Sequence, residues 1–134
     1  MMLTGKSKTY SIHYDASIGT VVMIWKGYAT SDEFREGTEY MLQVLLENKA
    51  HKVLADIKEM TLIGMEDQRW LDTNFLPRAI QAGFKAIAIV EPVAYFNKVA
   101  VESISYKISK DKLDIRFFEN AEAAKSWLST WISQ

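Results

Sequence analysis

The sequence predicts one α/β domain, a layered sandwich in which a mixed, mostly parallel sheet of five strands is covered by four helices. Three observations lead to this fold class. The chain has 134 residues, 49% hydrophobic and 25% charged, which suits a single globular core without an internal linker over residues 1–134. Segments with strand and helix periodicity follow one another in the order ββαβαβαβα. The middle strands are continuously apolar, whereas the outer ones alternate, as central and outer strands do.

Two strands open the chain. Apolar and polar residues alternate over residues 9–15, which is typical of a half-buried strand. After a turn at 16–20, residues 21–25 are all apolar, which indicates a strand covered on both faces. We expect these two strands to form a hairpin, with residues 10–14 as an outer strand whose free edge can pair with a second copy of the chain.

The first helix begins at a capping box. Thr30 and Glu33 have the spacing at which a hydroxyl and a carboxylate each accept a free backbone N–H. The helix is expected to end near Asn48. Its apolar stripe consists of Phe34, Thr38, Met41, Leu42, Leu45 and Leu46.

A short strand and a second helix follow. Residues 53–57 are a short apolar strand, with Asp56 near its carboxyl end. A helical stretch begins at about Met65 and reaches Gly83, a natural helix C-cap. Pro77 lies inside this stretch, and because proline has no N–H to donate, we expect a kink or a restart of the helix there.

The last third of the chain repeats the alternation. Residues 84–90 predict a central strand, and Pro92 opens a third helix. Residues 113–118 alternate again, which predicts an edge strand. Asn120 caps the last helix. The buried positions of that helix are Ala124, Leu128 and Trp131.

Composition excludes several classes of protein. The chain has 16 Lys and Arg against 17 Asp and Glu, without a clustered basic stretch, so we expect no nucleic-acid partner. It has no cysteine, which rules out disulfides and thiolate metal sites and favours the cytoplasm. The longest run without charge, 16–25, is too short for a transmembrane segment, although peripheral membrane contact stays open.

Motifs for catalysis or cofactors are missing from the sequence. The six glycines fit neither a dinucleotide-binding nor a P-loop pattern. His13 and His51 have no metal-ligand spacing and no nucleophile motif to activate, so we interpret both as exposed side chains. Asp56 is a candidate acid or base, but it is more readily explained as an acceptor for the loop that follows. We therefore expect no enzyme, no cofactor and no metal.

Aromatic residues supply the remaining signal. A set of large side chains is expected to flank the same central strands, at the starts of the second and third helices; it comprises Trp70, Phe75, Leu76, Tyr95 and Phe96. Such a set is either core, or an apolar pocket or partner surface. Trp127 and Trp131 are spaced i, i+4 in the last helix, where one of the two could meet another subunit in a homodimer.

The chain resembles the STAS superfamily, and within it the SpoIIAA-like proteins of the STAS/SEC14 type. The resemblance covers nearly the whole chain, at the level of fold patterns. It is carried by Val-Leu-Ala-Asp-Ile at 53–57, Glu-Asp-Gln-Arg-Trp at 66–70, Leu-Pro-Arg-Ala at 76–79, Gly83 before the strand at 84–90, Arg-Phe-Phe at 116–118, and Ala123, Ala124 and Trp127.

What the resemblance implies is an interaction module without catalysis. In the regulatory members a Ser or Thr at a helix N-terminus is phosphorylated. Here that position falls on Met65, and no hydroxyl residue lies within two positions of it, so the phospho-switch is not expected. The module would dock a protein partner or a second copy of itself. The SEC14-type label implies an alternative, the binding or carriage of a small apolar or lipid-like molecule among the aromatic set.

Overall fold

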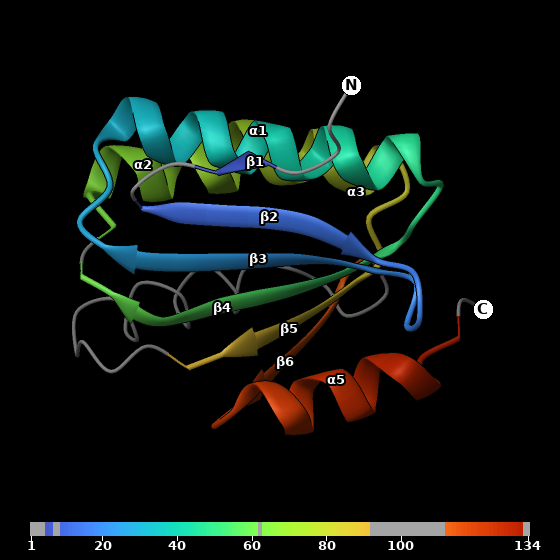
Figure 1. Cartoon of the computed structure of the whole chain (residues 1–134). Helices are drawn as coiled ribbons and strands as arrows, with labels where there is room; N and C mark the ends of the chain where they lie inside the picture. The colour runs from blue at the N-terminus through green and yellow to red at the C-terminus, as the bar shows by residue number, and fades with distance from the viewer. Residues whose placement is uncertain (1–4, 7–8, 62, 92–111, 133–134) are drawn as a thin grey trace.

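The sheet of the computed structural model has six strands in the order of the sequence, and the structure describes residues 5–6, 9–61, 63–91 and 112–132 (Figure 1). The strands are β1 (Gly5–Lys6), β2 (Tyr10–Asp15), β3 (Thr20–Gly27), β4 (Lys52–Met60), β5 (Ala86–Val90) and β6 (Asp114–Phe118). The first three pair antiparallel, and β3 to β6 are parallel. The expected α/β class with a mixed, mostly parallel sheet is thereby confirmed.

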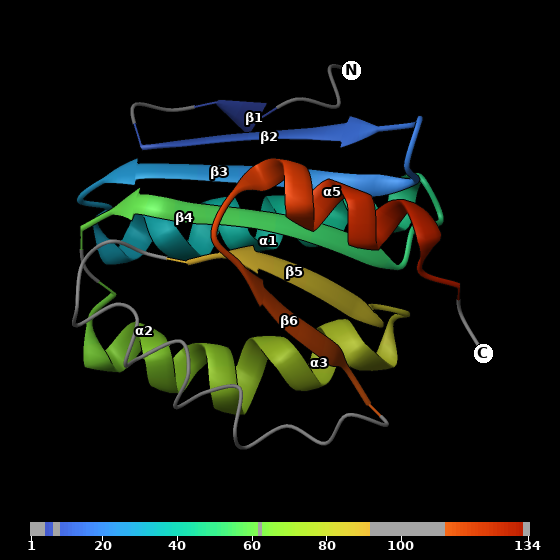
Figure 2. The ribbon, with the colours of Figure 1, turned by 90° about the horizontal axis from the view of Figure 1, so that it is seen from below.

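The helices form two layers, one on each side of the sheet. The elements α1 (Ser31–Glu47), α2 (Met65–Trp70), η1 (Leu71–Phe75) and α3 (Leu76–Gln81) cover one side, called here the first face (Figure 1). Among the described helices, α5 (Ala121–Thr130) covers the opposite side, the second face, as the view from below shows (Figure 2). The helix expected to open at Pro92 lies outside the described residues.

Local signals placed the helix ends correctly. Thr30 Oγ1 accepts the Glu33 N–H at 3.2 Å while a Glu33 carboxylate oxygen accepts the Thr30 N–H, which completes the capping box. Asn48 is the C-cap of α1, as expected. Gly83, at φ +118°, follows α3, and Asn120 Oδ1 accepts the Ala123 N–H at 2.9 Å ahead of α5.

Pro77 restarts the helix through a change of helix type. Residues Leu71–Phe75 form a π-helical turn, η1, and Pro77 lies in the first turn of α3 directly after it. Because Pro77 cannot donate to the carbonyl four residues earlier, the wider turn accommodates the missing hydrogen bond. The predicted kink or restart is therefore found as a π-helical segment inside one continuous helical stretch.

Three expectations about the edges of elements were wrong. The two-residue strand β1 pairs with β2 at Ser11 and Ile12, so β2 is not the outermost strand. The strand expected at 53–57 runs to Met60 and contains a β-bulge, which places Asp56 in its middle. There Asp56 Oδ1 accepts the Lys58 N–H at 3.2 Å. The last helix ends at Thr130, so Trp131 follows it and is not part of its face.

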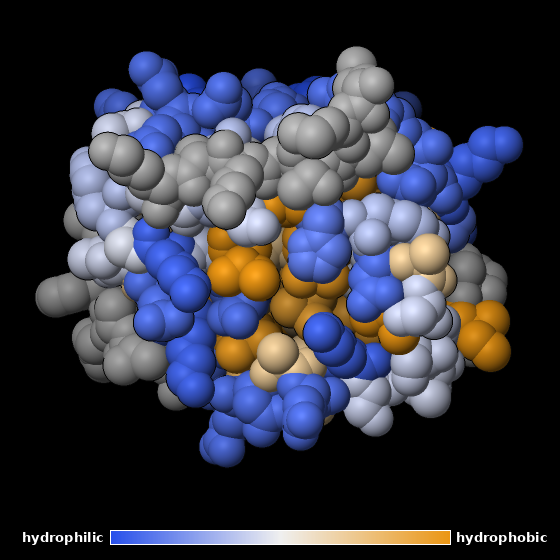
Figure 3. Space-filling model, viewed as in Figure 1, coloured by the Kyte–Doolittle hydropathy of each residue, from blue (hydrophilic) through white to orange (hydrophobic). Residues whose placement is uncertain are grey.

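The core is divided by the sheet into two clusters of unequal size. The larger cluster fills the first face, and a row of stacked rings crosses it with centroid distances of 5.1 to 6.3 Å: Tyr10, Trp25, Phe34, Trp70 and Phe75. The smaller cluster lies under α5. Because α5 packs on β4, β5 and β6, apolar surface remains visible between β2 and α5 (Figure 3).

Candidate functional site

An apolar cavity of about 120 Å³ lies between the sheet and the helices of the first face. Its described lining comes mainly from side chains of α1, η1 and α3 and of strands β3 to β6, and it is partly open. The described residues that line it are Met23, Trp25, Phe34, Thr38, Met41, Ala55, Ile57, Met60, Ile63, Leu71, Phe75, Leu76, Phe84, Ile87, Ile89, Leu113 and Ile115. We call this space the apolar cavity.

Strand alternation and the bulge in β4 build the floor of the apolar cavity. Every second residue of a strand faces the same side, so Ala55 and Ile57 both point to the first face. Met60 would face the second side by strict alternation. The bulge adds one residue between positions 56 and 59, which shifts the phase of the strand and brings Met60 to the cavity as well.

The π-helical segment supplies the opposite wall. Leu71 and Phe75 are the first and last residues of η1, and Leu76 begins α3; all three line the apolar cavity. The wider π turn places residues four and five positions apart on one face, so that a short segment presents three large side chains. Phe75 is almost fully buried, and Ala79, one turn further along, is fully buried.

The aromatic set expected from the sequence is thereby partly located. Phe75 and Leu76 line the apolar cavity. Trp70 is outside its lining but stacks on Phe75, with ring centroids 5.5 Å apart, so that it supports the wall from behind. Tyr95 and Phe96 lie outside the described residues. Met23 and Met41 were expected only as buried positions of a strand and a helix, and Met60 was not singled out; all three line the cavity and adapt easily to the shape of a neighbour.

Among the described lining residues, Thr38 has the one polar side chain, and it is already bonded. Its Oγ1 donates to the carbonyl oxygen of Phe34 at 2.7 Å within α1. The described lining therefore presents carbon and sulfur to anything inside, and no charged group. A cavity of this kind excludes water, which needs two or more polar partners, and accepts an apolar molecule.

Two groups of charged side chains fix the helical wall to α1. At one end Asp67, which is buried, accepts hydrogen bonds from Ser31 Oγ at 2.7 Å and from Arg35 Nε at 3.1 Å. At the other end Arg78 forms a bidentate pair with Glu39, at 2.6 and 3.1 Å. The Glu39 carboxylate raises the pKa of Arg78 further above its ordinary value. Such paired geometry holds the orientation of planar groups well.

The position expected for a phosphoacceptor carries no nucleophile. Met65 is the first residue of α2, and 77% of its side chain is exposed. Gly64 before it is the N-cap and makes no side-chain hydrogen bond. Phosphorylation of the kind known in the regulatory members needs a hydroxyl, which the Met65 side chain lacks.

The remaining titratable candidates lie apart from one another. His13 is on the second-face side of β2, and His51 precedes β4, where its Nδ1 lies 2.8 Å from the carbonyl oxygen of Gly83. In the described ranges no three His, Cys, Asp or Glu side chains come together as a metal site. Within those ranges, too, no helix has the length and apolarity to span a membrane.

Comparison with known proteins identifies a family and a solved structure with a similar fold. The family model named SpoIIAA-like matches residues 20–129 of the chain. No curated protein matches it. A solved structure, described as that of an uncharacterized protein from the DUF3478 family with a SpoIIAA-like fold from Shewanella loihica PV-4, is similar with a TM-score of 0.63 and 20% identity. The similarity covers 92% of this chain and 99% of the other, and at that identity it shows a common fold.

Proposed function

The chain belongs to the SpoIIAA-like family, and we propose that it is a non-enzymatic binding protein that holds a small apolar molecule in the apolar cavity. The observation that carries the proposal is the cavity itself, about 120 Å³ of space with an almost wholly apolar lining at the centre of the larger core. Protein interiors are normally packed as densely as organic crystals, so unfilled space of this size costs stability that a ligand restores.

The size and lining of the apolar cavity define the ligand class. Dry apolar cavities of about 150 Å³ accept benzene or xenon, so a single ring or a short alkyl chain of about six to eight carbon atoms fits here. Flexible Met23, Met41 and Met60 side chains in the wall allow some variation in ligand shape. Because the chain has no cysteine, we place this activity in the cytoplasm.

The direct test is native mass spectrometry of freshly purified protein, followed by denaturing extraction and small-molecule analysis. A co-purified apolar compound in stoichiometric amount supports the proposal. Toluene is then added as a probe, and the chemical shifts of backbone amides are followed by NMR. We expect saturable shifts at Ala55, Phe75 and Ile87, and a higher melting temperature with toluene present.

A cavity-filling variant provides the control. Ala55→Val places two methyl groups in the apolar cavity and should abolish the toluene-dependent rise in melting temperature. Ala123→Val makes the same change at an exposed position of α5 and should leave that rise intact. If wild-type protein carries no compound and toluene shifts none of the cavity amides, the proposal is wrong.

A second candidate function, an interaction module that docks a protein partner or another copy of the chain, is supported at one end of the sheet. Tyr28 follows β3 and Met65 begins α2, and their side chains are 61% and 77% exposed. The Thr61 N–H donates to the Gly27 carbonyl at 2.9 Å, which joins the loops after β3 and β4. Large exposed apolar side chains at one end favour a docking surface.

This second candidate is tested by the double variant Tyr28→Ser and Met65→Ser. Light scattering after size exclusion reports whether the wild-type chain is a dimer, and pull-down from lysate of the source organism reports a partner. Under the docking hypothesis either association is lost in the double variant and kept in Ala55→Val. Association that survives the double variant places the contact elsewhere.

A further inference from the structure

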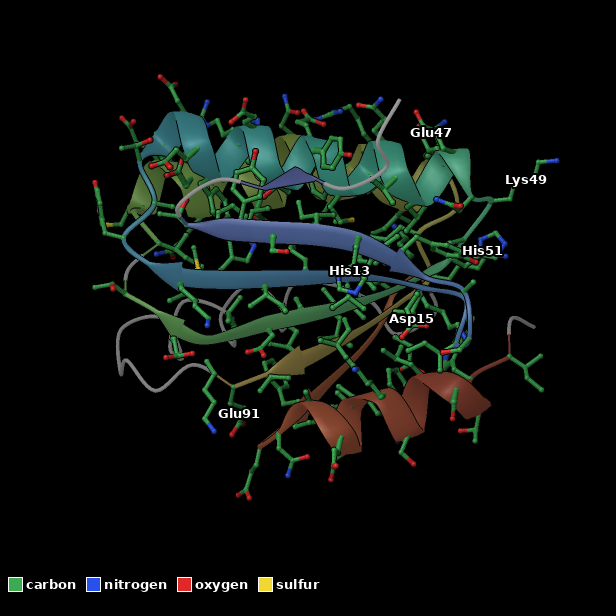
Figure 4. All side chains as sticks on the ribbon, in the orientation of Figure 1. His13, Asp15, Glu47, Lys49, His51 and Glu91 are labelled. Carbon is green, nitrogen blue, oxygen red and sulfur yellow. The ribbon has the colours of Figure 1, made fainter. Side chains whose placement is uncertain are left out.

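A second hollow, a crevice of about 320 Å³, lies at the end of the sheet where β3 and β4 begin. Three segments that are distant in sequence meet there: the β2–β3 turn, the loop between α1 and β4, and the chain after α5. The residues that line it are Tyr14, Gly19, Lys49, Ala50, His51, Lys52, Trp131 and Ile132. Figure 4 shows Asp15, Glu47, Lys49 and His51 gathered at this end of the molecule.

Lys52 brings a positive charge into the crevice. Its side chain passes Gly19, where an added Cβ would lie 3.9 Å from Lys52 Cε and 4.0 Å from Tyr14 Oη. Lys52 Nζ donates to the carbonyl oxygen of Leu128 at 2.7 Å, which leaves two of its three N–H groups for other partners. Partial burial lowers the pKa of Lys52, and no other cause contributes. The ammonium is thus half-buried beside a neutral oxygen.

The carboxylates nearest in the fold have partners of their own. Asp15 accepts two hydrogen bonds from Ser17, and Glu47 accepts one from Gln43 at 3.1 Å. Asp114 accepts the indole N–H of Trp131 at 3.2 Å. In the described part of the chain no carboxylate forms an ion pair with Lys52. An anion from outside would therefore meet an ammonium that has no counter-ion among the described residues.

The walls of the crevice combine a polar and an apolar part. His51 is oriented by the contact of its Nδ1 with the Gly83 carbonyl, which leaves Nε2 without a partner among the described residues. The Trp131 side chain is held by the hydrogen bond from its indole N–H to Asp114, and it forms part of the wall. Ile132 extends this wall, and 79% of its side chain is exposed.

From this arrangement we infer that the crevice binds a small organic anion with an aromatic or aliphatic body. The anionic group accepts hydrogen bonds from the Lys52 ammonium and the Tyr14 hydroxyl, and the body packs on Trp131 and Ile132. A charge-assisted hydrogen bond at a partly desolvated ammonium supplies the affinity, and the apolar wall selects against simple inorganic anions. The apolar cavity, whose described lining carries no charged side chain, takes neutral molecules instead, so this inference stands independently of the proposed function.

The experiment is a titration of ¹⁵N-labelled full-length protein with benzoate, followed by amide and indole NMR signals. We expect saturable shifts at Gly19, Ala50, Lys52 and the Trp131 indole, with a dissociation constant of about 1 mM, typical of a ligand with few contacts. Benzyl alcohol has the ring without the charge and acetate the charge without the ring; each should bind about tenfold more weakly. Shifts confined to the apolar cavity would overturn the inference.

Matched lysine variants distinguish benzoate binding at the crevice from a general effect of the protein's net charge. Lys52→Met should weaken benzoate binding about tenfold, whereas Lys58→Met, the same change further along β4 on an exposed side chain, should leave it within about twofold. Ile132→Ser removes part of the apolar wall, should weaken benzoate binding about threefold, and serves if Lys52→Met does not fold. Equal losses in Lys52→Met and Lys58→Met, or equal affinity for benzyl alcohol and benzoate, would refute the site.

Discussion

The two faces of the sheet are filled to different degrees. On the first face four described helical segments and the row of aromatic rings cover a larger core that borders about 120 Å³ of unfilled space. On the second face the ten-residue helix α5 covers a smaller cluster of buried side chains. The comparison suggests two roles: the smaller cluster serves the fold, and the larger face also offers space that a ligand can use.

The largest effect on stability is expected from truncating a buried side chain on the second face. Leu128 is a fully buried residue of α5, and Leu128→Ala should lower the free energy of unfolding by about 2–5 kcal/mol, because the substitution removes buried apolar surface and leaves a cavity. Leu46→Ala is the matched control, since Leu46 on α1 is 47% exposed, and it should change stability by about 0.5 kcal/mol or less. Urea unfolding measures both, and similar losses would contradict the distinction between the faces.

A pair of enlargements compares the faces directly. Ala55 on β4 lines the apolar cavity, whereas Ala88 on neighbouring β5 belongs to the smaller cluster under α5 and is fully buried. Ala88→Val should cost about 1–3 kcal/mol because the added methyl groups have no space. Ala55→Val should raise stability by about 0.5–1 kcal/mol because the same groups fill a void.

The outcome of this pair is measured by the urea midpoint at unchanged slope. Each variant controls the other, since the chemical change is identical and both strands are central. If Ala55→Val costs as much as Ala88→Val, the space next to Ala55 is not available to a side chain, and the proposed ligand site loses its main support.

What the sequence predicted well was local. Thr30 with Glu33, Gly83 and Asn120 satisfy or terminate backbone hydrogen bonds within a few residues, so their patterns alone located helix ends. Phe75 was expected on the buried stripe of its helix, and the set that also contains Leu76 was left open as either core or the lining of a pocket or partner surface; both residues border the apolar cavity.

What the sequence did not predict depends on distant partners. The bulge in β4 arises only when this strand is paired with β3, and it changes which residues after Asp56 face the cavity. The crevice needs the β2–β3 turn and Trp131 at the same place. Trp131 continued the helical spacing of α5, yet it follows the helix: its backbone N–H donates to Leu128 in the last turn of α5, and its indole N–H donates to Asp114 in β6. No window of neighbouring residues contains such information.

The close packing of α1 against the sheet gives a third prediction. Gly37 lies where an added Cβ would be 2.7 Å from Cη2 of buried Trp25 and 3.1 Å from Cδ2 of Tyr10. Gly37→Ala should therefore cost about 1–2 kcal/mol, although alanine favours a helix by about 1 kcal/mol over glycine. Gly64→Ala, with no atom within 4 Å of its added Cβ, should stay within about 0.5 kcal/mol. Equal effects in thermal unfolding would mean that α1 can move away from the sheet.

The smallest effect concerns how the helices of the two faces end. After α1 and α3 the chain turns back with the same pair of bonds: Ala50 N–H to Leu45 and Lys49 N–H to Leu46 in the first case. The turn after α3 has Gly83 at the position of positive φ, whereas the turn after α1 has Lys49 there, at φ +52°.

Since an L side chain is strained at this position, Lys49→Gly should raise the free energy of unfolding by about 0.5–1 kcal/mol relative to Lys49→Ala, which keeps the Cβ. On the second face α5 ends differently. The carbonyl oxygen of Leu128 in its last turn accepts a hydrogen bond from the Lys52 ammonium of β4, so no single glycine can improve that end. Chemical denaturation of the two Lys49 variants measures this difference in the free energy of unfolding. If Lys49→Gly is no more stable than Lys49→Ala, the turn after α1 is not strained, and filling the apolar cavity is then the remaining way to stabilise the first face.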